Sequence, residues 1–289
     1  MRGRSAILAL VAVLAIAAAA CGGNGETGGG GTPTASATTG EPLPEFTTLQ
    51  EGVLTVGSCL DYAPFETVEG GDEVGFDVDL SEEIAKRLGL TVKWVTADFD
   101  TIFTAVAADQ FDMVAAAVTA TGKDGEERDQ VVDFSDFYFN SRQSLTVNSE
   151  QTPDITSTDD LGEGDIVGAQ KGTTGLTWAR DNLEPQGVEI KTFQTAPDAF
   201  RDLEAGNIQG VINDEQSSVG IIEDLPALEV VEPIDTNEKY AFPFSPSNPE
   251  LREAVDIVLK QIIDDGTYAE IFEKYFPGQE VPPEYQPAG

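Results

Sequence analysis

The chain has 289 residues, of which 52 are Asp or Glu, 16 are Lys or Arg and none is His, so its formal charge at pH 7 is −36. Phosphate binding needs a basic face, so this charge argues against nucleic-acid binding. The absence of histidine removes the usual general base at neutral pH and the commonest metal ligand, and we expect neither a metal nor a cofactor. A hydrophobic fraction of 40% provides for a core of one large or two medium domains.

The N-terminus has the pattern of a secretion signal. Two arginines precede an apolar run over 6–20, which is short for a membrane span and ends in small residues. Cys21 follows directly, as in a bacterial lipobox, although Ala18 stands where a large aliphatic residue is usual. We therefore expect residues 1–20 to be removed and Cys21 to carry a lipid anchor such as palmitate. Ordinary cleavage near Ala20 is the alternative.

A linker rich in Gly and Thr follows over 21–48 and is suited to tether a folded domain to a membrane. Cys59 is the other cysteine of the chain, so no disulfide is expected within the folded part. We expect no further membrane segment. The sequence therefore predicts a monomer held on the extracytoplasmic face of the cell membrane.

Beyond the linker, strand and helix patterns alternate in two consecutive units. The first unit is expected to have strands over 53–58, 91–97 and 111–116 and helices over 76–89 and 99–110. The second is expected to have strands over 165–170, 188–193 and 210–214 and helices over 173–183 and 196–206. This alternation predicts an α/β fold in which mostly parallel sheets are flanked by helices.

Helical patterns over 248–266 and 268–276 end the folded part, with no strands left to cover in the second unit. We expect these helices to return to the first unit, which makes two lobes joined by two chain crossings, with a cleft between them. The crossings are expected near 140–145 and 230–238. The expected boundaries are 49–141 with 234–281 for lobe 1, 142–233 for lobe 2, and 282–289 for a C-terminal tail.

Arg128 lies in the acidic stretch TATGKDGEERDQVVDFSDFYF (119–139), and two uses are open to it. It could form a solvated ion pair with Glu127 or Asp129, which would contribute little to stability. Its planar guanidinium could instead hold a ligand carboxylate through two parallel hydrogen bonds.

Two further features could contact a ligand. Asp214 ends the strand over 210–214, where ligands sit in open α/β sheets, but it could also be the N-cap of the next helix. The turn KGTTG (171–175) leads into a helix whose first N–H groups can face an anion, with simple capping by Thr173 as the alternative.

Seven stretches, taken in chain order, carry a family resemblance. They are YAPFE (62–66), VGFDVDLSEEIAKRLG (74–89), FDTIFTAV (99–106), ERDQVVDFSDFYF (127–139), VGAQKGTTG (167–175), AGNIQGVINDE (205–215) and DDGTYAEIFEKYF (264–276). Together they resemble the family 3 solute-binding proteins of polar amino acid ABC importers, which have the type II periplasmic binding fold. The resemblance covers about residues 50–277. It implies a lipid-anchored protein that binds a free amino acid and delivers it to an ABC permease.

The resemblance also implies roles for single residues. Arg128, Thr119 and Thr174 would hold the ligand's α-carboxylate, and Asp214 and the Ala117 carbonyl would receive its α-ammonium. The side-chain positions are Tyr62 and Phe99, which would sandwich the ligand, and Gln170 and Asn213, which would select it. A Phe at a helix start, as at Phe99, is also typical of core packing. The segment GKDG (122–125) lengthens the turn before Arg128 relative to the family.

Cys59 stands where many relatives have an aspartate beside the polar end of the ligand, and Asp61 would point differently in an extended segment. We therefore expect a glutamine- or glutamate-like ligand rather than a basic one, and no enzyme activity. The same fold also resembles cyclohexadienyl dehydratases, which need a carboxylic acid as general acid, for which Asp61 or Glu66 could be proposed. A sensor domain is a third alternative, and it would require transmembrane and kinase segments.

Overall fold

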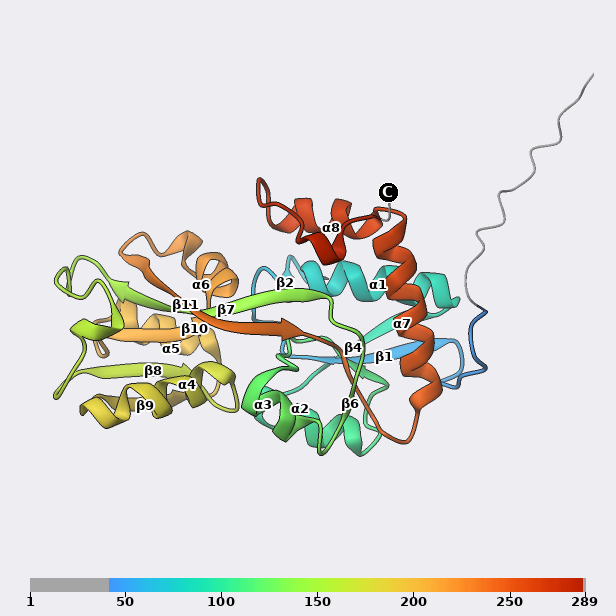
Figure 1. The fold of residues 1–289 in the computed structure, drawn as a ribbon, viewed down its shortest axis with the longest axis horizontal. Coiled ribbons are helices and arrows are strands. Elements are labelled where there is room, and N and C mark those ends of the chain that lie inside the picture. Colours follow the sequence, from blue (N-terminus) through green and yellow to red (C-terminus); the bar gives the residue numbers. More distant parts are fainter. Residues whose placement is uncertain (1–41, 288–289) are drawn as a thin grey trace, which may run out of the picture. The chain divides into compact units, whose positions relative to one another are not determined.

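The computed structural model describes residues 42–287. The expected secretion signal and the expected lipid site at Cys21 lie outside the described residues, as does most of the expected linker. Two five-stranded sheets organise the described part (Figure 1). None of the helices in this part is both long and apolar enough to cross a membrane.

The first sheet has the strand order β4-β1-β5-β12-β6 and forms the core of the first lobe. Strand β1 pairs in parallel with β4 and β5, whereas β12 pairs antiparallel with β5 and β6. The strands are β1 (Val53–Ser58), β4 (Thr91–Thr96), β5 (Met113–Val114), β6 (Asp133–Phe134) and β12 (Pro243–Phe244), beside a hairpin of β2 (Thr67–Glu69) and β3 (Asp72–Val74). The helices are α1 (Phe76–Leu88), α2 (Phe99–Ala107), α3 (Gly122–Arg128), α7 (Pro249–Asp264) and α8 (Thr267–Tyr275).

The second sheet has the order β11-β7-β10-β8-β9 and forms the core of the second lobe. Strand β8 pairs in parallel with β9 and β10, whereas β7 pairs antiparallel with β10 and β11. The strands are β7 (Phe139–Asn148), β8 (Ile166–Gln170), β9 (Glu189–Phe193), β10 (Gly210–Asp214) and β11 (Leu228–Tyr240). The helices are α4 (Thr174–Asn182), α5 (Ala196–Glu204) and α6 (Glu215–Ile221).

Strands β7 and β11 are the two chain crossings, and they run side by side between the lobes (Figure 1). Their ladder extends from the pair Asn148–Leu228 to the pair Phe139–Tyr240. Helices α7 and α8 both contact α1, so the chain does return to the first lobe after the second crossing. The predicted two-lobe α/β class is therefore confirmed. Both sheets are mixed rather than mostly parallel, because the crossing strands and β12 join them antiparallel. The residue boundaries of the lobes stay a prediction.

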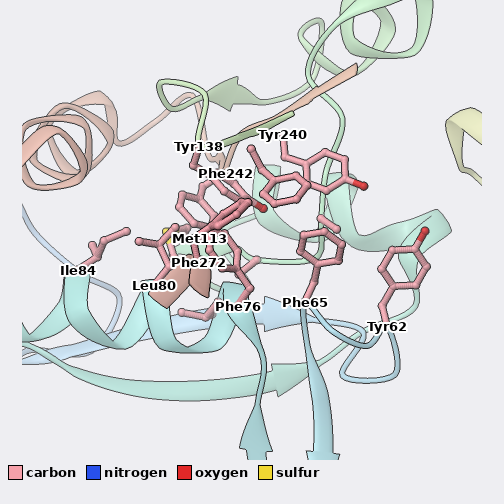
Figure 2. Close-up of a cluster of buried hydrophobic side chains, with 14 of the residues drawn as sticks. Tyr62, Phe65, Phe76, Leu80, Ile84, Met113, Tyr138, Tyr240, Phe242 and Phe272 are labelled. Atoms are coloured by element: carbon pink, nitrogen blue, oxygen red, sulfur yellow. The ribbon is translucent and has the colours of Figure 1, made fainter. Parts of the chain in front are cut away.

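An aromatic cluster fills the first lobe at the base of the two crossings (Figure 2). The Phe65 ring lies 5.3 Å from that of Tyr240, and Tyr138 stacks on Phe242 at 4.2 Å. Such aromatic pairs contribute about 0.5–1.5 kcal/mol each beyond the area they bury. Tyr62 stands at the end of this cluster, next to Phe65, so its position follows from core packing (Figure 2).

Helix α3 contains the GKDG segment that lengthens the turn before Arg128. GKDG is the first turn of a seven-residue helix, and Arg128 is its last residue. A Cβ atom on Gly125 would lie 2.3 Å from the carbonyl carbon of Ala120, so glycine is needed for α3 to lie against that backbone. The acidic neighbours Glu126 and Glu127 are exposed, whereas Arg128 is buried. The extra residues therefore build the support of the arginine.

We expect Gly125→Ala to destabilise the protein, although alanine is the better helix former. The added methyl group must displace the Ala120 backbone or α3, and overpacking of this kind costs about 1–3 kcal/mol. Urea unfolding followed by circular dichroism measures the change. Gly162→Ala is the matched control, because nothing lies within 4 Å of its added Cβ. A Gly125 variant as stable as this control would contradict the packing described above.

Candidate functional site

A cavity of about 20 Å³ lies between the lobes, room for about one water molecule. The residues that line it come from both lobes. They are Cys59, Tyr62, Glu66, Phe99, Ala116, Ala117, Thr119 and Arg128 from the first lobe and Gln170, Thr173, Thr174 and Asp214 from the second. Every residue expected at the ligand site lines this cavity except Asn213. An amino acid is larger than the cavity, so its entry requires the lobes or the lining side chains to move.

Arg128 is buried at the cavity, with 7% of its surface exposed. Its guanidinium donates from Nη1 to the Thr119 carbonyl (2.6 Å) and from Nη2 to the Gly172 carbonyl of the second lobe (3.0 Å). It also lies 4.9 Å from the centre of the Phe103 ring, a cation–π distance. Both hydrogen bonds within the described residues go to carbonyls, so Arg128 is not a solvated ion pair with its acidic neighbours.

Asp214 ends β10 and is also buried, but it does not cap α6 with its side chain. Its carboxylate accepts from the Tyr62 hydroxyl (2.9 Å), the Tyr240 hydroxyl (2.6 Å) and the Gln143 amide. Burial and then the charge of Glu238 raise the pKa of Asp214 to about 7, against the opposing effect of these hydrogen bonds. A buried carboxylate of this kind is stabilised by a cation in contact with it.

The KGTTG turn divides its two threonines between structure and cavity. Thr173 is the N-cap of α4, because its Oγ1 accepts from the Leu176 N–H (3.2 Å). Thr174 instead donates from its hydroxyl to Glu238 (3.0 Å), and that hydroxyl lies 3.1 Å from the Gln143 amide nitrogen. Capping by Thr173 therefore leaves Thr174 and the first N–H groups of α4 at the cavity.

The YAPFE turn brings Tyr62 and Glu66 together. The Tyr62 N–H donates to the Glu66 carbonyl (2.7 Å), which closes the turn. Glu66 is fully buried, lines the cavity, and neither of its carboxylate oxygens has a hydrogen-bond partner among the described residues. Burial, with the charge of Asp77 next in weight, raises the pKa of Glu66 well above its usual range. A buried carboxyl without donors is costly, which favours a partner that enters the cavity.

Three more of the expected residues, Phe99, Gln170 and Cys59, line the cavity. Phe99 begins α2 and packs edge-to-face on Phe103 at 5.4 Å, so it is both core and cavity wall. Gln170 lines the cavity but donates its amide to the Gln194 carbonyl (3.1 Å). Cys59 lines the cavity, and burial raises the pKa of its thiol well above the usual range, which keeps it neutral.

Ala117 and Asn213 occupy different positions. Ala117 lines the cavity with a positive φ of 48°, and its N–H donates to the Asp77 carboxylate (2.9 Å). Asn213 lies beside the cavity without lining it, and it accepts from the Tyr62 hydroxyl (2.9 Å). Asn213 therefore supports a wall residue in this arrangement.

Two residues of the crossings were not foreseen. Gln143 on β7 and Glu238 on β11 are both buried and donate to or accept from the residues that line the cavity. They are 95 positions apart, and only the pairing of the two strands brings them together. No local motif marks either of them in the sequence.

Comparisons with known proteins agree with this architecture. The model of the bacterial extracellular solute-binding proteins, family 3, matches residues 54–278. The histidine-binding periplasmic protein of Salmonella typhimurium is 28% identical over 242 residues, which cover 77% of this chain and 87% of that protein.

Solved structures give the same result. An ancestral arginine-binding protein has a TM-score of 0.73 and 34% identity in its arginine-bound and glutamine-bound structures, covering 78% of this chain and 98% and 99% of those chains. An ancestral amino acid-binding protein, described as a precursor of cyclohexadienyl dehydratase, has a TM-score of 0.71 and 34% identity, covering 78% of this chain and 96% of its own.

The match over most of the chain, together with the two lobes and the cavity between them, identifies the class. The chain belongs to the family 3 bacterial extracellular solute-binding proteins. Its two-lobe fold is that of the amino acid-binding proteins named above, as the family resemblance implied.

Asp77 bonds the backbone of the cavity residue Ala117. It is a buried acid whose effect on stability can be tested through pH. It accepts from the Ala117 N–H and the Tyr138 hydroxyl (2.8 Å), and burial raises its pKa to about 7 despite both bonds. A carboxyl with a raised folded-state pKa binds more protons in the folded than in the unfolded state. The stability it contributes is therefore present near pH 4 and is lost as the pH rises through 7.

We expect wild type to lose stability relative to Asp77→Asn between about pH 4 and pH 7, by up to about 1.4 kcal/mol per pH unit. The asparagine keeps an oxygen for both hydrogen bonds and has no charge to bury. Urea unfolding across this pH range measures the difference between the two proteins. If the stability of the two proteins changes in the same way with pH, the pKa of Asp77 is not raised in the folded state.

Proposed function

We propose that this protein is the substrate-binding protein of an ABC importer and binds a free L-α-amino acid in the cavity between its lobes. One observation carries the proposal: a buried guanidinium and a buried carboxylate line the same cavity, Arg128 from the first lobe and Asp214 from the second. Such a pair complements the carboxylate and ammonium groups of a zwitterion.

The division of the two charges between lobes gives the mechanism. A ligand bound to the first lobe alone meets Arg128, and only the closed arrangement adds Asp214. Ligand therefore shifts the protein towards closure by its extra affinity for the closed form. In this proposal Cys21 carries the lipid anchor on the extracytoplasmic face, the protein is a monomer, and its partner is the permease of the importer. Tyr62 and Phe99 form the walls around the ligand's side chain.

The side chain of the ligand is the finer question. The cysteine at position 59 weakens the case for a basic ligand, but Glu66 supplies an unpartnered buried carboxyl to the same cavity. A ligand side chain that ends in N–H donors can donate to both oxygens of Glu66, whereas a ligand carboxylate has no donor to offer them. We therefore propose glutamine first and arginine second, and place glutamate behind both. The glutamine-bound and arginine-bound structures of the ancestral relative support these two choices.

Glu66 also has properties that a second function, an enzyme activity, would require. A fully buried carboxyl with a raised pKa in a cavity has the properties of a general acid. An activity like that of cyclohexadienyl dehydratase is therefore the second candidate. Turnover of a prearomatic carboxylic acid, followed by the absorbance of the aromatic product, would support it. The binding function does not require any turnover.

The main test is a thermal-shift scan of the twenty amino acids against wild type and Arg128→Ala. A ligand at a hundredfold excess over its Kd stabilises wild type by about 2.7 kcal/mol. We expect Arg128→Ala to weaken binding by about 100-fold or more, because it leaves the ligand carboxylate buried without its partner. Arg142→Ala is the matched control, since Arg142 is exposed and pairs with Glu215. Equal affinities in the two variants would reject the role of Arg128.

Glu66→Gln separates the two ligand classes. The amide keeps the size of the side chain but cannot ionise beside a guanidinium, so we expect arginine to bind about tenfold or more weakly. Glutamine, which is neutral, should lose less than about threefold because the amide still offers an acceptor. Calorimetric titration measures both, with Glu69→Gln on the exposed β2 strand as control. Unchanged arginine affinity would show that Glu66 does not contact the ligand's side chain.

A further inference from the structure

Glu238 is shared by the two lobes. It lies on β11, opposite Ser141 of β7, and only 5% of its surface is exposed. Its Oε2 accepts from the hydroxyl of Thr119 in the first lobe (2.6 Å) and from that of Thr174 in the second (3.0 Å). One carboxylate oxygen therefore holds two cavity residues that belong to different lobes.

The other oxygen of Glu238 is also occupied. Its Oε1 accepts from the Gln143 amide (2.9 Å) and the Thr236 hydroxyl (2.7 Å). The same Gln143 amide nitrogen also donates to Asp214, which joins the two carboxylates. Four donors thus fix the orientation of Glu238. The residue does not line the cavity, but it stands behind two residues that do.

The protons of the two threonines decide what the cavity offers to a ligand. A hydroxyl has one proton to donate and two lone pairs to accept with. Thr119 and Thr174 each donate their one hydroxyl proton to Glu238. Their hydroxyl oxygens can then only accept hydrogen bonds. The Gln143 amide nitrogen also lies 3.1 Å from the Thr174 hydroxyl, but its two protons suffice only for Asp214 and Glu238, which are nearer. The hydroxyls can therefore accept from an ammonium group, and they cannot donate to a carboxylate without leaving Glu238.

We propose that Glu238 is a positioning residue that fixes Thr119 and Thr174 as hydrogen-bond acceptors for the ligand's α-ammonium group. The proposal rests on the proposed function, since it assumes an amino acid in this cavity. The α-carboxylate is then held by Arg128 and the first N–H groups of α4, without help from either hydroxyl. This reverses the role that the family resemblance implies for Thr119.

The charges around the cavity agree with this assignment. Asp214 and Glu238 are linked through Gln143, and Arg128 lines the same cavity. A negative charge behind the threonines attracts an ammonium group and repels a carboxylate. Glu238 therefore helps to set which way round the amino acid lies.

The test is a cycle between position 238 and the two hydroxyls, measured on the full chain with whichever of glutamine and arginine binds in the scan. Glu238→Gln should weaken binding about tenfold in the wild-type background, because a charged acceptor for two hydroxyls is lost. In the Thr119→Val, Thr174→Val background the same change should cost less than about twofold, since no hydroxyl is left to position. Glu229→Gln, an exposed carboxylate on the same strand, is the charge-matched control.

A second arm changes the ligand. The effect of Glu238→Gln should persist with the α-carboxamide of the amino acid, which keeps the ammonium group. It should vanish with the deaminated acid, which keeps the carboxylate. If Glu238→Gln does not fold, as judged by urea unfolding, Thr119→Ser against Thr119→Val decides. The serine keeps a hydroxyl and should keep affinity within about threefold, whereas the valine should lose it only for ligands with an ammonium group.

Four results would overturn the inference. Tighter binding by Glu238→Gln would make Glu238 a competitor of the ligand carboxylate. Equal losses in both backgrounds, or with all three ligands, would make its role purely structural. If the wild-type protein binds no amino acid, both the proposed function and this inference are wrong. Binding that depends on Arg128 but not on Glu238 would remove the inference alone.

Discussion

The antiparallel ladder between β7 and β11 is the constraint on which the rest of the structure depends. Both crossings between the lobes lie in this one ladder, so the lobes are joined along a single pair of strands. The ladder is irregular where it passes the cavity, because its register shifts between Ile234 and Glu238. Such a bulge re-aims the side chain beside it, and here that side chain is Glu238. The hinge and the support of the site are therefore the same segment.

The site also depends on a few buried charges in a protein that has a large excess of acidic residues. Arg128 is buried and rests on aromatic rings, while the carboxylates next to it in sequence face solvent. An exposed ion pair between Arg128 and a neighbouring carboxylate would contribute little to the stability of the fold. Burial without a contacting carboxylate leaves its charge available, and the carbonyls that it bonds are weaker partners than a ligand carboxylate. Helix α3 supplies this burial, so the segment that lengthens the turn serves the site.

Much of this could be predicted from the sequence. Helix α1 lies within the predicted 76–89 and stops at Gly89, which takes the left-handed conformation that a helix end favours. The role of Asn213 stays a prediction, because it does not line the cavity although its amide oxygen, like the Asp214 carboxylate, accepts from the Tyr62 hydroxyl. Glu238 and Gln143 could not be found in this way. Their contact depends on a strand register and a bulge between segments 95 residues apart, which no local pattern encodes.

An unpartnered carboxyl at the cavity bears on the proposed ligand. Glu66 lines the cavity and is fully buried, yet neither of its oxygens has a partner among the described residues. Each such group costs stability while it stays unpaired. Under the proposed function, a ligand whose side chain ends in N–H donors would satisfy Glu66. Part of its affinity would then come from a cost that the folded protein already carries, and a ligand without such donors would bind more weakly.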